Sequence, residues 1–182
     1  NFAETINGLN FPTNRTAETT SHNSGLELSG QARLDKLSID FGVAYLDSEL
    51  GTFSGVVDPF RTPPDNVVDL SGARAPFSPE LTGNIGIAYD LQIGDFRVTP
   101  RVDYSHVDAT QAALWDTDKE TLDSRDLVNL QIQLAPSSDK WSATLWSTNV
   151  FDRQYVAGIQ NNATLYYAAP PRQYGLRVKY NF

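Results

Sequence analysis

Residues 174–182 read Tyr-Gly-Leu-Arg-Val-Lys-Tyr-Asn-Phe, with an apolar side chain at every second position. The apolar members are Tyr174, Leu176, Val178, Tyr180 and Phe182, and two of the residues between them are Arg177 and Lys179. Successive side chains of a β-strand point to opposite faces. The alternation therefore predicts a strand with one apolar face and one charged face.

The same alternation recurs in six earlier segments of the chain. These are residues 26–34, 37–45, 81–91, 96–104, 128–134 and 141–150. Helical spacing of apolar residues is scarce, so the sequence predicts an all-β fold of about seven strands. The register of 141–150 stays open, because Trp and Leu occur on both of its faces.

Short and long connections alternate between these segments. Residues 35–36, 92–95 and 136–140 are short connections, whereas 51–79, 106–125 and 152–172 are long ones. An up-and-down outer-membrane barrel has short turns at one end and long loops at the other. A soluble β-sandwich has no such parity of connection lengths.

The two faces of the segments differ in charge. One face of six segments carries no charged residue, and its Tyr and Phe residues gather near the strand ends, as in interfacial girdles. The opposite face carries Glu27, Arg33, Asp40, Asp90, Arg97, Arg101, Asp103, Arg177 and Lys179. A Lys or Arg that faces lipid at the bilayer midplane costs about 2–4 kcal/mol. We therefore expect part of an antiparallel transmembrane β-barrel, with a soluble sandwich as the alternative.

Composition excludes several classes of protein. The 182 residues carry a formal net charge of −8, which argues against nucleic-acid binding. The absence of cysteine excludes disulfides and zinc–thiolate sites. No stretch reaches 18 apolar residues, as a transmembrane helix requires. Because the chain contains no Met and no signal peptide, we interpret it as a piece of a longer protein.

Pro100 lies inside a predicted strand, where we expect a bulge or a missing hydrogen bond.

The candidates for chemistry are few. Asp116, Asp118 and Glu120 have the spacing of a calcium loop, but Thr121 stands where that loop requires Gly. His22 and His106 are isolated, and the charges of the polar face are interpreted as ion pairs. We expect no enzyme activity, catalytic residue, metal or cofactor. Ligand contacts are expected in the long connections, whose aromatic residues can stack on a sugar or a catecholate or can pack the loops together. They are Phe53, Phe60, Trp115, Tyr166 and Tyr167.

Several motifs resemble one family. Residues 149–155, Asn-Val-Phe-Asp-Arg-Gln-Tyr, resemble the Asn-Leu-Phe-Asp-Lys-x-Tyr motif at the penultimate strand of TonB-dependent receptors, with Val and Arg in place of Leu and Lys. Residues 171–175 resemble the start of that family's last strand, and 23–30 and 75–89 resemble two earlier strands. The closing Phe182, after alternating apolar residues, resembles the terminal signal of outer-membrane barrels. That signal implies recognition of residues 174–182 by the barrel-assembly machinery.

The resemblance covers about residues 20–182 and implies a function. Members are 22-stranded outer-membrane barrels of Gram-negative bacteria, filled by an N-terminal plug, that take up iron-siderophores, cobalamin or sugars with energy passed through TonB. Residues 1–182 would be the C-terminal part of the barrel, in contact with lipid, the remaining barrel and the plug. TonB would contact only N-terminal parts that this chain lacks. The alternatives are a soluble sandwich that binds a ligand and a small structural barrel with an eighth strand from residues 1–12.

Overall fold

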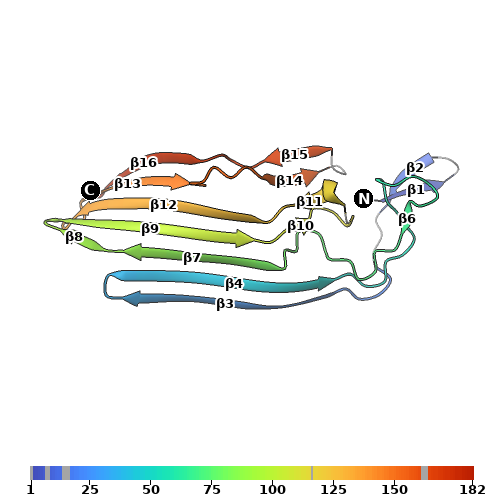
Figure 1. The fold of residues 1–182 in the computed structure, drawn as a ribbon, viewed down its shortest axis with the longest axis horizontal. Helices are drawn as coiled ribbons and strands as arrows, with labels where there is room; N and C mark the ends of the chain where they lie inside the picture. The colour runs from blue at the N-terminus through green and yellow to red at the C-terminus, as the bar shows by residue number, and fades with distance from the viewer. Residues whose placement is uncertain (1, 7–8, 14–16, 116, 161–163) are drawn as a thin grey trace.

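The computed structural model describes residues 2–6, 9–13, 17–115, 117–160 and 164–182. Its largest sheet is antiparallel, and each long strand pairs with the next one along the chain (Figure 1). The strands are β3 (His22–Leu34), β4 (Leu37–Glu49), β7 (Leu81–Tyr89), β8 (Leu91–Ile93), β9 (Phe96–Val107), β12 (Arg125–Pro136), β13 (Trp141–Thr148) and β16 (Gln173–Tyr180). The all-β, up-and-down prediction is confirmed, since every predicted segment falls in this sheet.

The register of β13 is fixed by its two neighbours. Leu145 pairs with Ile132 of β12 and Leu176 of β16, which places it on the apolar face. Trp146 lies on the polar face opposite Gly175, where a Cβ would come within 2.7 Å of the indole ring. The indole therefore covers a glycine, which explains why an aromatic residue occurs on the face that is otherwise polar.

Pro100 interrupts one ladder and leaves the other intact. It pairs with Ile132 in the unbroken register between β9 and β12. On the other side, β7 ends at Tyr89 and β8 begins at Leu91, both in the same register with β9. The interruption thus faces the residue that has no N–H to donate. Of the two expected outcomes, the missing hydrogen bond is correct and the bulge is absent.

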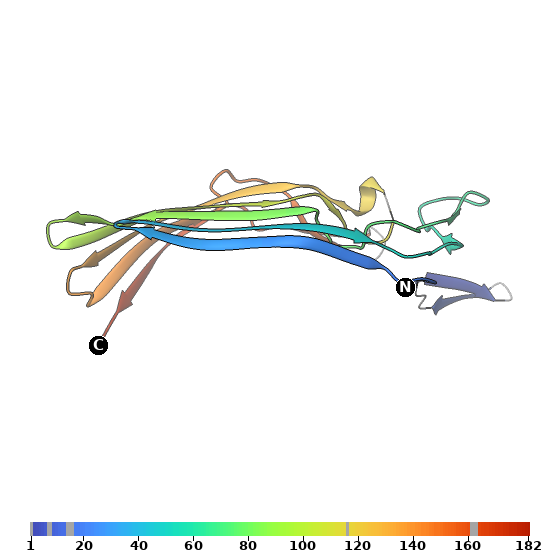
Figure 2. The ribbon, with the colours of Figure 1, turned by 90° about the horizontal axis from the view of Figure 1, so that it is seen from below.

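The apolar face of the sheet is not covered by any other described element. Leu26 is 73% exposed and Val178 is 66% exposed. Most of the other large apolar side chains of this face are also exposed. Figure 2 shows the strands edge-on as one curved layer. A sandwich buries its apolar face against a second sheet, so the sandwich alternative is wrong for the described residues.

Aromatic side chains mark both ends of the apolar face. Near the short turns, the ring centroids of Phe96 and Trp141 lie 6.2 Å apart, and those of Tyr180 and Phe182 lie 5.2 Å apart. Tyr104 lies on the same face toward the other end of β9. It lies eight positions after Phe96, which corresponds to roughly 27 Å along a strand. This length fits the apolar band of about 25 Å in outer-membrane barrels.

Small paired segments gather at the end of the sheet that carries the long connections (Figure 1). The pairs are β1 (Phe2–Ile6) with β2 (Leu9–Thr13), β5 (Val56–Val57) with β6 (Val67–Val68), β10 (Thr110–Gln111) with β11 (Thr121–Leu122), and β14 (Val156–Gln160) with β15 (Leu165–Ala168). A short 3-10 helix, η1 (Asp118–Glu120), precedes β11. In the described residues β1 and β2 pair only with each other, so they do not supply an eighth strand to the large sheet. None of the helical structure described is long and apolar enough to cross a membrane.

Candidate ligand-binding loops

The long connections fold around a small core of their own. Phe53, Val56, Leu70 and Trp115 are buried against one another, with Phe53 only 3% and Trp115 7% exposed. The backbone N–H of Leu70 donates to the Phe53 carbonyl at 2.9 Å, and that of Phe53 donates to Ser71 Oγ at 2.9 Å. Phe53 and Trp115, which the sequence suggested as ligand contacts, therefore pack two connections together.

A second set of contacts joins three of the connections at Lys119. Its Nζ lies 5.6 Å from the centroid of the half-buried Phe60 ring. The Tyr166 hydroxyl donates to the Lys119 carbonyl at 2.9 Å. Tyr166 and Tyr167 are about half exposed, at 52% and 49%. Of the five aromatic candidates, these two have exposed surface. Lys119, which contacts both Phe60 and Tyr166, was not singled out from the sequence.

The base of the connection between β13 and β16 is held by Asn149. This residue is buried, its Oδ1 accepts from the Arg153 N–H at 2.8 Å, and its Nδ2 donates to the Arg153 carbonyl at 2.9 Å and the Pro170 carbonyl at 3.4 Å. Its backbone adopts φ 49°, a left-handed conformation that Asn tolerates better than most residues. Asp152 Oδ1 accepts from the Arg172 N–H at 2.8 Å. The motif at 149–155 thus forms a turn that closes a long loop.

A turn in the 50–80 connection is also held by side-chain hydrogen bonds, in this case to the carboxylate of Asp69. Ser71 donates to Asp69 Oδ1 from its hydroxyl at 2.5 Å and from its backbone N–H at 2.9 Å. These two hydrogen bonds favour the ionised carboxyl and lower the pKa of Asp69. Because Ser71 Oγ also accepts from Phe53, the charge of Asp69 is connected to the buried core of the loops.

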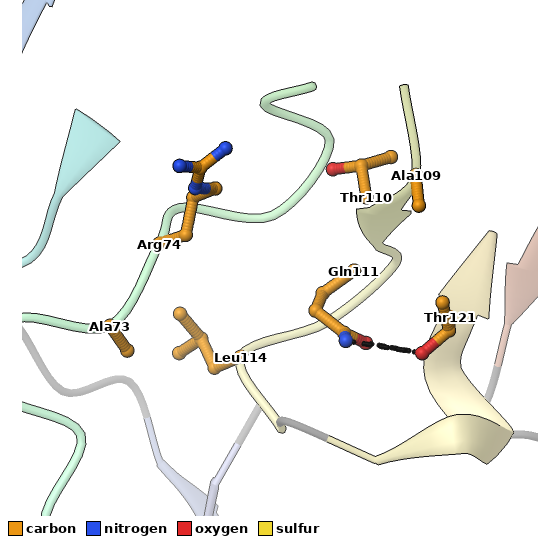
Figure 3. A pocket seen from close by; sticks show the side chains of 7 residues that line it. All are labelled: Ala73, Arg74, Ala109, Thr110, Gln111, Leu114 and Thr121. Atoms are coloured by element: carbon orange, nitrogen blue, oxygen red, sulfur yellow. Dashed lines mark hydrogen bonds between the residues drawn. The ribbon is translucent and has the colours of Figure 1, made fainter. Parts of the chain in front are cut away.

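A cavity of about 310 Å³ lies between the 50–80 and 108–124 connections. It is lined by Ala73, Arg74, Ala109, Thr110, Gln111, Leu114 and Thr121 (Figure 3). Gln111 Nε2 donates to Thr121 Oγ1 at 3.1 Å across one wall. Sequence reasoning missed these residues, because they form no motif and come from two irregular segments.

Several charged residues of the polar face form ion pairs. Arg101 bonds Asp40 at 2.7 Å and Asp103 at 2.5 Å. Gly86 lies directly beneath, where a Cβ would clash with the Arg101 guanidinium and with Asp40. The structure thus brings together three of the charged residues predicted for this face, as the ion pairs that the sequence analysis expected.

Two other arginines of this face form ion pairs elsewhere, Arg33 with Asp90 at 3.3 Å and Arg97 with Asp139 at 2.6 Å. Arg33, Arg97 and Arg101 therefore each have a carboxylate partner, as expected for ion pairs that line a wet surface.

The residues considered as metal ligands do not converge in the described part of the chain, where no group of three ligating side chains is found. His106 lies between Asp126, 2.8 Å from Nδ1, and Asp108, 3.1 Å from Nε2. Of the acidic trio in the 108–124 connection, Asp116 lies outside the described residues, while Asp118 and Glu120 belong to η1.

The five residues of the expected assembly signal share the exposed face of the last strand and its end. They are Tyr174, Leu176, Val178, Tyr180 and Phe182. Their strand, β16, forms one edge of the large sheet. Their recognition by an assembly machinery stays a prediction.

Comparisons with known proteins agree with this architecture. Residues 1–180 match the family model described as TonB dependent receptor-like, beta-barrel. The fold is similar to the ferric yersiniabactin uptake receptor FyuA from Yersinia pestis, with TM-score 0.71 and 16% identity over 89% of this chain and 24% of that one. It is also similar to the siderophore receptor PiuA from Acinetobacter baumannii, with TM-score 0.67 and 18% identity over 87% of this chain and 21% of that one.

A third similar structure is BauA, the ferric preacinetobactin receptor from Acinetobacter baumannii, with TM-score 0.67 and 21% identity over 89% of this chain and 22% of that one. The chain thus spans about a quarter of the length of these receptors or less, and at such identities the likeness is one of fold. No curated protein matches the chain in sequence. The family and these structures are receptors and transporters, not enzymes.

Proposed function

The chain belongs to the TonB-dependent receptor β-barrel family, and from this premise we propose that it forms part of the wall and the extracellular loops of a receptor that takes up a scarce ligand with energy delivered through TonB. Receptors of this family are outer-membrane proteins of Gram-negative bacteria, and this is the location of the chain. The proposal concerns what the complete receptor does there.

The observation that carries the proposal is the two-sided sheet. Its apolar face is open, while its other face holds ion pairs such as Arg101 with Asp40. A barrel wall requires lipid on one side and a wet interior on the other. The edge strands β3 and β16 each lack a neighbour on their outer side in the described residues, as expected where the rest of the barrel would pair.

The end of the sheet that carries the long connections, called the loop end, supports a role in ligand capture. Tyr166 and Tyr167 present half-exposed rings on the two opposite sides of β15, and the Tyr166 hydroxyl is bound to the 108–124 connection, which is held by a buried core. Rigid aromatic surfaces on a supported loop suit stacking on a planar or ring-shaped ligand. We propose a ferric siderophore as the first ligand class, as for the receptors with a similar fold, and cobalamin or a carbohydrate as the other classes.

The partners follow from this role. The polar face would contact a plug domain, the apolar face would contact outer-membrane lipid, and TonB would act through N-terminal parts of the receptor. Residues 174–182 would be recognised by the barrel-assembly machinery. Each of these partners is part of the proposal for the complete receptor.

Uptake measurements test the proposal. Cells that carry or lack the gene for the complete receptor, each with and without TonB, are supplied with radiolabelled ferric siderophores, cobalamin and oligosaccharides. We expect one class to enter only when both the receptor and TonB are present. Accumulation of that class without TonB, or equal accumulation of all three classes without the receptor, would contradict the proposal.

Loop variants locate the capture surface. The double change Tyr166→Ala and Tyr167→Ala should lower uptake at limiting ligand, because it removes both exposed rings. Phe77→Ala is the matched control, since Phe77 is also an exposed aromatic side chain in a long connection but lies outside this surface. Equal loss of uptake in both variants would contradict the assignment of the two tyrosines.

A further inference from the structure

Charges without a partner on the polar face of the large sheet occur at its two edges. On the inner strand β9 the charges of this face form ion pairs, such as Arg101 with Asp40, and Arg125 at the loop end of β12 lies 5.5 Å from the centroid of the Tyr155 ring. In the described residues, the charges of this face that contact neither an opposite charge nor an aromatic ring are Glu27, Arg177 and Lys179. They belong to β3 and β16, the two edge strands (Figure 1).

The ion pairs of this face run sideways, from one strand of the wall to another. Arg101 of β9 reaches Asp40 of β4 across Gly86 of β7, whose lack of a side chain leaves the path open. Arg33 of β3 reaches Asp90, directly after β7, across β4. Each of these two arginines thus finds its carboxylate within the wall, two strands away.

On the inward side of β16 the wall offers no free carboxylate. Arg177 pairs in register with Thr144 of β13, and Lys179 pairs with Ser142. The described polar faces of β12 and β13 carry no carboxylate. Asp139, in the turn between these two strands, already has an arginine partner. A carboxylate for the two cations of β16 can therefore come only from beyond this strand.

The free edge of β16 indicates the source of that carboxylate. A strand that pairs with this edge places its polar-face side chains directly beside Arg177 and Lys179, with Cβ atoms about 4.5–5.5 Å apart. A domain inside the barrel would face the inner strands as well as the edges. The inner strands are balanced within the wall, so the distribution of unpaired charge favours a neighbouring strand over a domain in the lumen.

We propose that the receptor strand that hydrogen-bonds to the free edge of β16 carries two carboxylates, two positions apart, which pair with Arg177 and Lys179. The spacing follows because residues 177 and 179 share one face, and alternate residues of the facing strand share it too. The ion pairs also fix the register, since a shift by one residue would turn the carboxylates toward lipid. The inference rests on the proposed role of the chain as one part of a complete barrel wall.

Zero-length cross-linking of the complete receptor in detergent tests the proposal. A carbodiimide joins a lysine amine to a carboxylate that it contacts, and mass spectrometry identifies the linked peptides. An electron cryo-microscopy map of the same sample identifies the strand next to β16. We expect Lys179 to be joined to an Asp or Glu of that strand. No link at Lys179, or a link to the plug domain or to any other part of the receptor, would overturn the proposal.

Two conservative variants test the origin of the link. Lys179→Arg keeps the charge but should lose the link, because a guanidinium does not form the amide. Lys36→Arg is the matched control, since Lys36 is an exposed lysine in the short turn between β3 and β4. It should leave the link unchanged, and loss of the link in both variants would contradict its assignment to Lys179.

Charge reversal tests whether the pairing stabilises the junction. The double change Arg177→Glu and Lys179→Glu should lower the temperature at which the folded, faster-migrating form disappears in electrophoresis, because like charges then face each other. Replacing the two facing carboxylates by Lys in the same variant should restore that temperature. Lys140→Glu, a reversal in an exposed short turn, is the control.

A lack of rescue, or equal lowering in the Lys140→Glu control, would contradict the pairing. The outcome is separable from uptake, which is measured on the unmodified receptor. Failure of the pairing would leave TonB-dependent uptake intact, and failure of uptake would leave the cross-link intact.

Discussion

The large sheet and the loop end place apolar side chains in opposite surroundings. In the sheet, Leu26 and Val178 are mostly exposed, whereas in the loops Phe53 and Val56 are almost fully buried. Burial of such a side chain contributes about 1.5–3 kcal/mol. The loops obtain this stabilisation from their own core. The sheet can obtain it only from an apolar environment outside the chain, which for an outer-membrane barrel is lipid.

The largest effect in this comparison is expected in the loop core. Phe53→Ala should destabilise the packing of the two connections by about 3–5 kcal/mol, since it removes a buried aromatic ring. Hydrogen exchange in the complete receptor should accelerate at residues 50–80 and 108–124 and stay unchanged in β3 and β4. Tyr167→Ala, which removes an exposed ring, is the control. Equal acceleration throughout the sheet would show that the two regions are not independent.

A charge on the apolar face of the sheet should have the next largest effect. Val178→Arg should cost about 2–4 kcal/mol if it faces the middle of the bilayer. Folding of the complete receptor into liposomes, followed by its electrophoretic shift, should fall sharply. Lys179→Ala changes the opposite face and should fold normally. Equal folding of the two variants would mean that the faces are wrongly assigned.

A smaller effect is expected where the two regions join. Asn149→Ala removes the hydrogen bonds to Arg153 and Pro170 and places Ala at a positive φ, which should cost about 1–3 kcal/mol locally. Proteolysis within the 149–172 connection should become faster. Asn149→Gly should lie between Ala and the unmodified protein, because Gly tolerates the backbone angle but lacks the side chain. The exposed Gln154→Ala is the control, and an equal effect there would contradict the role of Asn149.

The smallest effect should be the pH dependence of the loops. The pKa of Asp69 is lowered in the folded state by the hydrogen bonds from Ser71, so its ionised form stabilises the turn. This contribution is present above the unfolded pKa of about 3.9 and is lost as the pH falls through the lower, folded value. Pepsin cleavage at 50–80 should therefore rise below about pH 4. Asp69→Asn should flatten that rise, and an unchanged rise would exclude Asp69 as its source.

The sheet was largely predictable from the sequence because its side chains alternate with period two. Val178 and Lys179 lie on the faces expected from their neighbours. The register of β13 was not predictable, since Leu145 and Trp146 both resemble apolar-face residues until Gly175 is seen beneath the indole. Strong alternation determines facing, and a large aromatic residue on the polar face obscures it.

The loop end was predictable only in part. An aromatic residue in a loop can bind a ligand or pack a core, and the sequence does not distinguish Phe53 from Tyr167. The motif at 149–155 indicated the family, but the turn made by Asn149 depends on contacts with the distant Pro170. The cavity lined by Thr110 lies between two irregular segments, so no periodicity in the sequence could predict it.

The exposure of alternate residues in β16 to lipid tests the two-faced sheet most directly. The 182 residues contain no cysteine, so Leu176→Cys, Arg177→Cys, Val178→Cys and Lys179→Cys can each carry a fluorophore in the reconstituted receptor. Quenchers attached to lipid chains should act strongly at 176 and 178 and weakly at 177 and 179, while a water-soluble quencher should show the reverse. Equal quenching at all four positions, or the opposite alternation, would contradict a sheet with lipid on one face and water on the other.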